Sequence, residues 1–351
     1  MKSLRVVVSG AAGLIGYNLS GLLGDGTVFG TDYLVTLVLH DIPRCEKKLI
    51  ALKAELEDCA FEQWIVLVYE DIQFFTTAKE AFAGADVVFF LASLPLTGDN
   101  RRSLLSKNIA IYQDFGSNLN EVANKNCISI VVANPANTLA YVLMVNAPTI
   151  PRKNFIALNC TDHDRARSIA LRICREKCIP FDDPTLQLTD IEGITTWGNH
   201  GSTMYADTSR ATIRGSPLRD LIPDEELWEK DFVSLVERRG WVLLNLRDGV
   251  SSVLSVARAS IVVARWLFQG SNVATSSGKV VTLAACSDGN PYGVDEGLIF
   301  GMPVICENGS WRFVEGIEVN DKVKERIAIS AKDLKEEVDL VHQELERLDN
   351  N

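Results

Sequence analysis

The chain has 351 residues, of which 47% are hydrophobic and 23% charged, so its composition is that of a globular protein and excludes a disordered chain. The length suits two modest domains better than a single core. Acidic side chains outnumber basic ones by 46 to 35, a formal net charge of −11. This balance argues against a nucleic-acid partner, because phosphate binding needs clustered Lys and Arg. An anionic substrate would need a local basic site to overcome the overall field.

The sequence also argues against a membrane span, an export signal and a metal site. It contains no run of about 18 or more apolar residues. The N-terminal stretch has three valines before a glycine-rich turn, which is too short for a signal peptide, so the cytoplasm is expected. The eight cysteines are too dilute for a disulfide scaffold. Cys174 and Cys178 lack a His pair at ligand spacing, so we expect no metal site.

The first half of the chain alternates strand and helix patterns. Strands are expected at 6–8, 35–40, 86–92 and 128–133, and helices at 14–23 and around Leu49, Leu52 and Leu56. The last two strand runs are continuously apolar, which favours a parallel sheet covered on both faces. The pattern predicts an α/β fold with a Rossmann-type doubly wound parallel sheet.

The second half is more mixed and predicts an α+β catalytic domain. A buried helix is expected at 251–268, and strands at 280–284, 299–304 and 311–315, with Asn308-Gly309 as a hairpin turn between the last two. Ser330 and Asp333 fit a capping box, which predicts that a terminal helix begins there. The turn-rich stretch at 148–151 predicts a boundary between the doubly wound domain, 1–155, and the α+β domain, 156–351.

A glycine-rich motif, GAAGLIG, follows the first expected strand and opens the first expected helix. Its residues are Gly10, Ala11, Ala12, Gly13, Leu14, Ile15 and Gly16. Small residues let the backbone approach a pyrophosphate, and the helix N-terminus offers N–H groups to its charge, although helix packing also explains such glycines. Asp41 closes the second strand and can bond the ribose hydroxyls of adenosine, which favours NAD over NADP. No Tyr is followed by Lys four residues later, which argues against short-chain reductases and sugar epimerases.

Proton transfer is best assigned to His200 and to the segment Asp162-His-Asp-Arg165. His200 follows an expected strand at 193–197, from which a side chain can project into a cleft. An Asp bonded to one ring nitrogen fixes the tautomer and stabilises the imidazolium. Arg165 lies on the same helical face as Asp162 and can fork onto a carboxylate. From spacing alone, His200 could equally be structural, and Asp162 and Arg165 a surface ion pair.

Several sequence blocks in a fixed order carry a resemblance to a known family. They are GAAGLIG at 10–16, LHDI at 39–42, LEDCAF at 56–61, RRSLLSKN at 101–108, ANPANT at 133–138, DHDRA at 162–166, WGNH at 197–200, SDGNPYG at 287–293 and VEGIEVND at 314–321. By these blocks the chain resembles the lactate/malate dehydrogenase family, and within it the cytosolic, NAD-dependent malate dehydrogenase type.

The resemblance implies a role for each site residue. His200 is implied to accept and donate the proton, with Asp162 as its partner. Arg165 is implied to bind the substrate's C1 carboxylate as a bidentate fork, and Arg101 to polarise the ketone. The remaining implied residues are Asn134 beside the reacting hydroxyl and the nicotinamide, Asn108 and the backbone of 132–134 from Val132 along the cofactor, and Ser251 facing the substrate or, equally well, capping a helix.

The loop after Pro95 departs from the family pattern. The family places an arginine there for the second carboxylate of malate, whereas this sequence has Leu96, in a loop one residue shorter than expected. A carboxylate desolvated against Leu96 would lack a partner, at a cost on the order of several kcal/mol. Lactate-type enzymes that resemble this malate type carry Leu at that position, and Arg102 is a candidate substitute cation.

By the resemblance, the expected reaction is hydride transfer between malate and NAD. The main alternative is a lactate dehydrogenase-type enzyme acting on pyruvate or another apolar 2-oxo acid, and a non-catalytic NAD-binding protein is a third. The expected partners are a small 2-hydroxy or 2-oxo acid and a second copy of the chain in a cytoplasmic homodimer, with no nucleic acid and no membrane.

Overall fold

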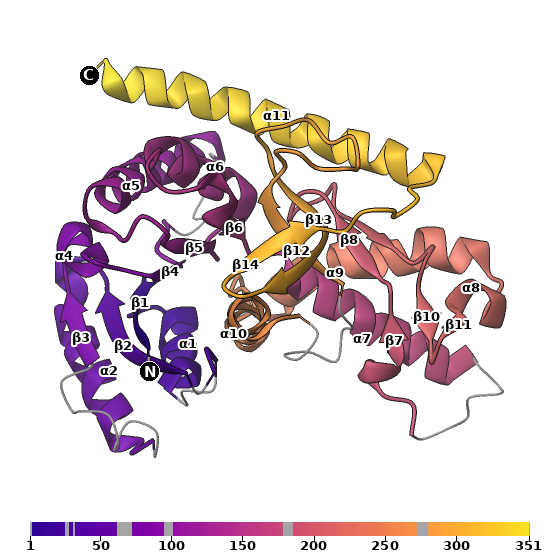
Figure 1. Ribbon diagram of the computed structural model, residues 1–351, viewed down its shortest axis with the longest axis horizontal. Helices are drawn as coiled ribbons and strands as arrows, with labels where there is room; N and C mark the ends of the chain where they lie inside the picture. The colour runs from indigo at the N-terminus through magenta and orange to yellow at the C-terminus, as the bar shows by residue number, and fades with distance from the viewer. Residues whose placement is uncertain are drawn as a thin grey trace. The chain divides into compact units, whose positions relative to one another are not determined.

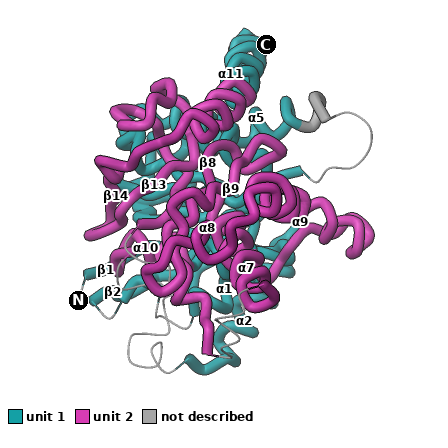
Figure 2. The backbone as a smooth tube through the Cα atoms, turned by 90° about the vertical axis from the view of Figure 1, so that its right-hand side faces the viewer, with its two compact units in different colours: residues 1–158, 256–261, 334–351 teal, residues 159–255, 262–333 magenta. Residues whose placement is uncertain are grey.

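The computed structural model describes residues 2–24, 28–30, 32–61, 72–94, 101–177, 185–271 and 280–350, without the side chains of 101–104 and 349. The chain divides into two compact units (Figure 2). The first unit contains Met1–Leu158, Val256–Ile261 and Leu334–Asn351, and the second contains Asn159–Ser255 and Val262–Asp333. The division into a first domain at 1–155 and a second at 156–351 stays a prediction.

The first unit is built from alternating strands and helices (Figure 1). Its elements are β1 Lys2–Ser9, α1 Leu14–Gly24, β2 Tyr33–His40, η1 Pro43–Cys45, α2 Glu46–Asp58, β3 Ile72–Phe75, α4 Ala78–Phe82, β4 Val87–Phe90, α5 Arg101–Val122, β5 Ile128–Val131, α6 Ala136–Asn146, η2 Arg152–Asn154 and β6 Phe155–Ala157. Parts of helices α10 (Leu254–Gln269) and α11 (Asp321–Asp349) also belong to this unit.

The strands of the first unit pair in parallel in the order β6-β5-β4-β1-β2-β3. The order reverses at β1. Right-handed crossovers therefore place α1 and α2 on one face of the sheet and α4, α5 and α6 on the other. The predicted doubly wound sheet is confirmed, and its switch point, where ligands bind in such sheets, lies between β1 and β4.

Apolar patterning explains why these segments form strands and helices. Strands β4 and β5 are buried along their whole length, as their continuous apolar sequences predicted. Leu49, Leu52 and Leu56 are the buried side chains of α2 and share one face of that helix. The hydrophobic core of the first unit thus lies between its sheet and the two helical layers.

The second unit combines small antiparallel sheets with helices. Its elements are α7 Cys160–Lys177, η4 Leu188–Asp190, β7 Ile191–Glu192, β8 Thr195–Trp197, β9 Tyr205–Asp207, β10 Thr212–Ile213, β11 Ser216–Pro217, α8 Leu218–Leu221, the π-helical turn η5 Leu227–Asp231, α9 Phe232–Leu246, β12 Val281–Cys286, β13 Ile299–Glu307 and β14 Ser310–Phe313. The pairings β8-β9, β7-β10-β11 and β12-β13-β14 are all antiparallel. The expected α+β architecture is confirmed.

Two local predictions in this half have different outcomes. Asn308 and Gly309 both have positive φ, +55° and +74°, and join β13 to β14, so the predicted hairpin turn is confirmed. The buried helix begins at Leu254, and its N-cap position is Val253, which makes no side-chain cap. The alternative role of Ser251 as a helix cap is therefore wrong.

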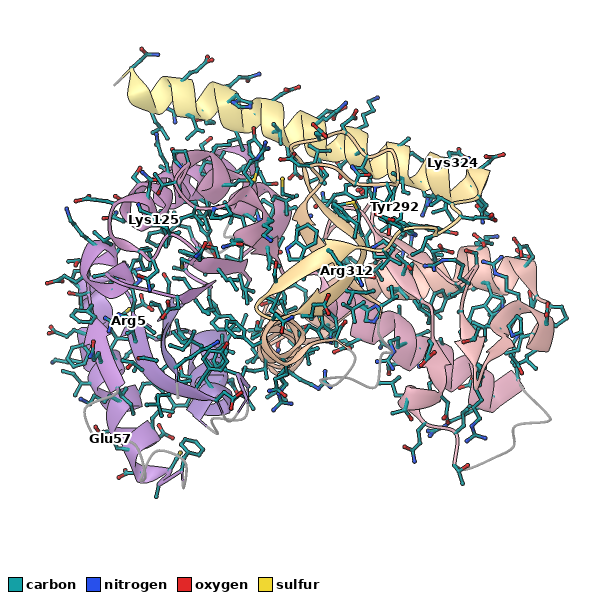
Figure 3. All side chains as sticks on the ribbon, viewed as in Figure 1. Arg5, Glu57, Lys125, Tyr292, Arg312 and Lys324 are labelled. Carbon is teal, nitrogen blue, oxygen red and sulfur yellow. The ribbon has the colours of Figure 1, made fainter. Side chains whose placement is uncertain are left out.

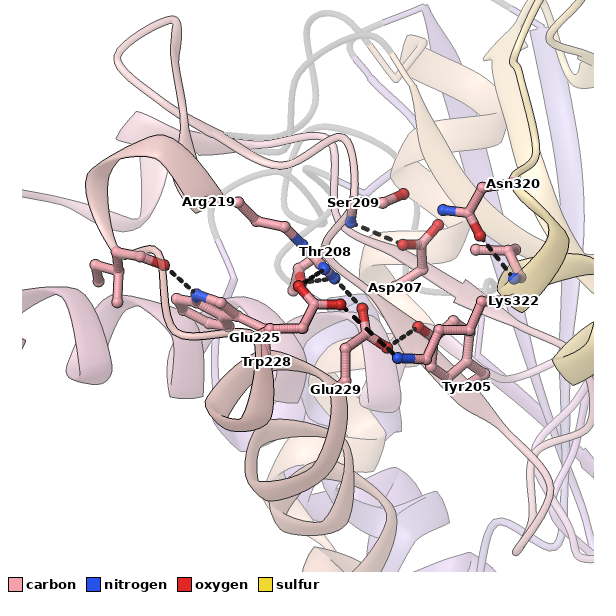
Figure 4. Close-up of polar contacts among 12 residues, drawn as sticks. Tyr205, Asp207, Thr208, Ser209, Arg219, Glu225, Trp228, Glu229, Asn320 and Lys322 are labelled. Carbon is pink, nitrogen blue, oxygen red and sulfur yellow. Dashed lines mark hydrogen bonds and ion pairs between the residues drawn. The ribbon is translucent and has the colours of Figure 1, made fainter.

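The predicted start of the terminal helix is also wrong. Helix α11 begins at Asp321, where the side-chain oxygen of Asn320 accepts a hydrogen bond from the Val323 N–H at 2.9 Å (Figure 4). Ser330 and Asp333 lie inside the helix, so their spacing is not a capping box. Their side chains reach another segment of the second unit, described below.

Within the described ranges, no helix is both long and apolar enough to cross a membrane. The same part of the chain holds no group of three or more His, Cys, Asp or Glu side chains that could bind a metal ion.

Candidate active site

The glycine-rich turn lies at the switch point of the sheet, between the ends of β2 and β4. The N–H groups of Gly10 and Ala11 donate to the carbonyl oxygen of His40 at 2.8 and 3.0 Å, which ties the turn to the end of β2. Gly10 has φ +92°, and a Cβ there would lie 2.6 Å from the backbone nitrogen of Ala92, just after β4. Only glycine fits at this position.

Gly13 and Gly16 differ in what surrounds them. A Cβ on Gly16 would lie 2.3 Å from the Gly10 carbonyl oxygen, so packing of α1 against the turn requires this glycine. A Cβ on Gly13 would meet only that same oxygen, at 3.3 Å, and Gly13 is exposed. Packing therefore explains Gly10 and Gly16 but not Gly13. Close approach of a ligand to the first turn of α1 is the expected reason for Gly13.

The carboxylate of Asp41 lies against this turn. Its Oδ2 accepts from the Ala12 N–H at 3.1 Å, and its Oδ1 accepts from the Ile42 N–H at 2.9 Å. These bonds fix an acidic group beside the glycines at the carboxyl end of β2. This is the arrangement that binds an adenosine ribose.

The other predicted cofactor residues follow β4 and β5. Asn108 on α5 is 2% exposed, and its Oδ1 accepts from the Leu94 N–H at 2.8 Å. The N–H of Val132 donates to Phe90 O at 2.8 Å, and the exposed Asn134 follows two residues later. Because the carboxyl ends of parallel strands meet at one edge, these residues lie on the edge that carries the glycine turn.

The second unit brings His200, Asp162 and Arg165 together. His200 Nδ1 and Asp162 Oδ2 are 2.5 Å apart, and Arg165 Nη1 donates to Asp162 Oδ1 at 2.9 Å. The Asp162 side chain is 4% exposed, whereas those of Arg165 and His200 are 14% and 23% exposed. The carboxylate is thus hidden behind two side chains that a small ligand can reach.

This geometry sets the charges of the pair. Burial would raise the pKa of Asp162, but the neighbouring His200 and then Arg165 outweigh it and hold that pKa below its usual range. Burial would lower the pKa of His200, and Arg165 acts in the same direction, but Asp162 holds that pKa above its usual value. Because Nδ1 is engaged with Asp162, exchange of a proton with a ligand is a task for Nε2.

Local contacts explain why His200 is held at the end of β8. The indole N–H of Trp197 donates to Asp207 Oδ2 at 3.2 Å. The Trp197 ring packs edge-on against the ring of Tyr292, with 5.1 Å between the ring centroids (Figure 3 labels Tyr292). The neighbouring β9 is fixed in turn by Tyr205, whose hydroxyl donates to Glu229 Oε2 at 2.7 Å (Figure 4). The paired strands thus form a rigid base for the loop that carries His200.

Two further contacts at Arg165 were not predicted from the sequence. Its Nη1 also donates to the Val236 carbonyl oxygen at 3.5 Å, and a Cβ on Gly240 would lie 4.0 Å from its Nη2. Both residues lie on α9. A Cβ at position 240 would be in ordinary van der Waals contact with the guanidinium, so α9 lies close beside Arg165.

Two other histidines are held neutral by burial. Burial lowers the pKa of His40 to about 4, and its ring bonds the Ser9 hydroxyl at 2.9 Å. Burial also lowers the pKa of His163, next to Asp162, to about 3. Neither of these two histidines is suited to proton exchange near neutral pH. His200, paired with the buried Asp162 carboxylate, is the histidine of this site that is suited to it.

Comparisons with known proteins agree with this arrangement. Residues 4–156 match the family model of the lactate/malate dehydrogenase NAD binding domain, and residues 187–345 match that of the family's alpha/beta C-terminal domain. The chain is also 35% identical to "Malate dehydrogenase 3, cytoplasmic" of Arabidopsis thaliana, over 97% of this chain and 95% of that protein.

The chain belongs to the lactate/malate dehydrogenase family.

Solved structures of this family show the same fold. A malate dehydrogenase from Naegleria fowleri matches with a TM-score of 0.86 at 33% identity, over 98% of this chain and 99% of that one. A Trichomonas vaginalis lactate dehydrogenase in complex with NADH and oxamate matches with a TM-score of 0.86 at 32% identity, over the same shares. NAD is thus the cofactor of this lactate/malate dehydrogenase family member, and the exposed Gly13 and the tethered Asp41 fit it.

Three predicted residues of the family site have substrate roles that the structure does not test, and two of them, Leu96 and Arg101, lie wholly or partly outside the described part of the chain. Leu96 lies outside the described residues. Arg101 opens α5, but its side chain is not described. Ser251 is exposed just before α10, where its carbonyl oxygen accepts from Arg247 Nη1 at 2.5 Å. The substrate roles of all three stay predictions.

The role of Gly13 can be tested by one substitution. We expect Gly13→Ala to weaken NADH binding roughly tenfold, because the added methyl group stands where the pyrophosphate approaches the turn. Thermal stability should change little, since the methyl group meets one protein atom. Fluorescence titration of NADH and a melting curve measure the two effects. The matched variant Gly16→Ala should instead lower the melting temperature, and equal NADH affinity in Gly13→Ala and wild type would contradict the assignment.

Proposed function

We propose that the protein is an NAD-dependent malate dehydrogenase, which interconverts malate and oxaloacetate. The observation that carries the proposal is the pair formed by His200 and Asp162, 2.5 Å apart, with Arg165 bonded to the same carboxylate. A His–Asp pair moves a proton, and an adjacent guanidinium binds a carboxylate. A 2-hydroxy acid presents a hydroxyl group and a carboxylate on neighbouring carbons.

The residues divide the work of the oxidation. His200 Nε2 takes the hydroxyl proton, and Asp162 stabilises the imidazolium that forms. Arg165 binds the C1 carboxylate and orients the substrate, while Asn134 bonds the reacting oxygen and Arg101 stabilises charge on it. NAD, when bound, supplies the acceptor of the hydride that leaves C2. In the reverse direction, protonated His200 returns the proton to the ketone oxygen.

The cofactor residues have a separate task. Gly10 to Gly16 let the turn and the first turn of α1 approach the pyrophosphate, and Asp41 bonds the adenosine ribose. Asn108 and Val132 line the remaining cofactor surface. In this proposal the NAD-binding domain is 1–155 and the substrate domain is 156–351.

The proposal is tested by NADH oxidation with two substrates. Absorbance at the NADH band is followed with oxaloacetate and, separately, with pyruvate at equal concentrations. We expect turnover with oxaloacetate to exceed turnover with pyruvate. Faster turnover of pyruvate would assign the lactate dehydrogenase type, for which Leu96 is the favouring observation. NADH binding without turnover of either acid would identify a non-catalytic binding protein.

The specificity position gives a second prediction. We expect Leu96→Arg to raise the ratio of kcat/KM for oxaloacetate over pyruvate about a hundredfold, because the added cation pairs with the distal carboxylate. Leu94→Arg, two residues earlier, is the matched control and should leave the ratio near that of the wild type. The two ratios come from steady-state kinetics. An unchanged ratio in Leu96→Arg would show that another residue faces the distal group.

We also propose a cytoplasmic homodimer. The support is the cytoplasmic relative and a set of exposed apolar side chains on α1, α2 and α9: Leu14 (63% exposed), Tyr17, Leu22, Ile50 (50%), Trp241 (68%) and Leu246 (75%). Exposed apolar side chains that lie together in one patch are typical of protein interfaces. Light scattering coupled to gel filtration measures the mass, and a monomer mass at micromolar concentration would contradict the dimer.

A further inference from the structure

Helix α11 touches the loop that carries His200. The Asn199 N–H donates to Ser330 Oγ at 2.8 Å, and the Asn199 side-chain amide donates to Asp333 Oδ2 at 3.1 Å. The Thr203 hydroxyl donates to the same Asp333 oxygen at 2.8 Å. Asn199 directly precedes His200, and Thr203 follows it by three residues. The side chains of Ser330 and Asp333 therefore bind the loop on both sides of the histidine.

Glycines on this loop permit the close approach of the helix. Gly198 has φ +94°, and a Cβ there would lie 2.2 Å from Ser330 Oγ. Gly198 also exchanges backbone hydrogen bonds of 3.1 and 2.9 Å with Gly301 on β13. The Gly201 N–H closes the turn on the Asn199 carbonyl oxygen at 2.9 Å. The loop is thus fixed between β13 and α11, and Asn199 is bonded to two side chains of the helix.

The two residues on α11 are unusual for their position. A serine inside a helix ordinarily bonds the carbonyl one turn earlier, and an Asp there ordinarily faces solvent. Ser330 is 1% exposed and accepts from a backbone N–H of another element. Residues three apart share a helix face, so the spacing that resembles a capping box serves a tertiary contact instead.

We infer that Ser330 and Asp333 are positioning residues for His200, holding its loop so that the imidazole meets the Asp162 carboxylate. The inference rests on the proposed function for its effect on turnover, though not for its effect on the histidine itself. Proton transfer depends steeply on geometry, because a displacement of about 1 Å can lower a rate about a hundredfold. Neither residue is proposed to touch substrate or cofactor.

The test uses Ser330→Ala, which removes the acceptor without changing charge. Among the described residues, Asp162 and Arg165 on α7 are charged groups that act on His200, and both are retained in this variant. We expect kcat for oxaloacetate reduction to fall about tenfold with unchanged NADH affinity. We also expect the pKa of His200 to fall toward its ordinary value, because the ring no longer meets Asp162 squarely. Asp333→Asn should act in the same direction.

The pKa is read by NMR on protein labelled with ¹³C-histidine. The chain has four histidines, so the His200 signal is assigned by its loss in His200→Asn. Asn320→Ala is the matched control, because Asn320 caps the same helix at Val323. Among the described residues, no hydrogen bond joins its side chain to the loop that carries His200. It should lower the melting temperature and leave the His200 titration unchanged.

Each outcome decides the matter. An unchanged His200 titration in Ser330→Ala would overturn the inference, even if kcat falls. A shift in the titration together with a lower kcat supports it. If the wild type reduces neither oxaloacetate nor pyruvate, the proposed function fails, whereas the NMR titration still tests the positioning of His200.

Discussion

Replacing His200 by Asn is expected to lower kcat for malate oxidation about a thousandfold or more, which is the size of a general acid–base contribution. Asn cannot accept the hydroxyl proton at the position of Nε2, and it cannot form the cation that Asp162 stabilises. NADH affinity should stay within about twofold of the wild type, because the proposed cofactor residues belong to the first unit. Steady-state kinetics and fluorescence titration measure the two quantities.

The matched control for this variant is His342→Asn. His342 is exposed on α11, where its Nε2 lies 2.9 Å from the Tyr141 hydroxyl, and it has no proposed role in the reaction. Its replacement should leave kcat close to that of the wild type. Turnover by His200→Asn within tenfold of the control would assign the proton transfer to another group.

Asp162→Asn is expected to lower kcat about 10³- to 10⁴-fold, as loss of the orienting carboxylate does in other His–Asp pairs. An amide at this position can donate to Nδ1, which stabilises the tautomer with its proton on Nε2. That tautomer cannot accept the hydroxyl proton. Arg165 also loses its anchor at 2.9 Å, so KM for the 2-hydroxy acid should rise as well.

The pH dependence of Asp162→Asn should shift in a known direction. In the wild type Asp162 raises the pKa of His200, so reduction of the 2-oxo acid, which needs the protonated ring, continues above pH 6.5 and is lost as pH rises through the raised pKa. In the variant that loss should occur at lower pH. The half-exposed Asp224 is the control site, and Asp224→Asn should keep the wild-type profile. A profile of Asp162→Asn identical to the wild type would contradict the pairing.

Local patterning was sufficient for most of the fold. The doubly wound sheet follows from apolar runs such as β4 and β5, which are buried on both faces and therefore carry no polar alternation. Asn308-Gly309 identifies a hairpin because both residues adopt positive φ, a conformation that few other pairs tolerate. These signals are contained in a few consecutive residues.

The errors arose where one spacing serves two purposes. Ser330 and Asp333 have the spacing of a capping box, but the same spacing places two side chains on one helix face, where they reach Asn199. Asn320, the residue that caps α11, was available in the sequence as an N-cap type ten residues earlier. Similarly, Ser251 looked like a cap, but α10 begins beyond it at Leu254.

The candidate site was also only partly predictable from the sequence. Asp162 and Arg165 are three residues apart on α7, so their ion pair could be predicted from the sequence. The contact of His200 with Asp162 joins residues 38 apart, and the approach of Gly240 to Arg165 joins α9 to α7. Such contacts depend on how the elements pack, which periodicity does not encode. Leu96 lies outside the described residues, so its role stays a prediction.

The net charge of the chain affects how this site captures an anionic substrate. The chain carries −11, which repels an anionic acid as it approaches. Arg165 offers a local cation whose guanidinium is partly exposed beside His200. Capture of the substrate in our proposal therefore depends on this arginine and on Arg101 rather than on the field of the whole protein.

In the proposed function, the protein passes a hydride between NAD and C2 of malate. The most direct measurement incubates the protein with oxaloacetate and NADH in which both hydrogens at C4 are deuterium, followed by mass spectrometry of the product. We predict malate that carries deuterium at C2. Malate without the label, or no malate while NADH stays bound and unoxidised, would contradict it.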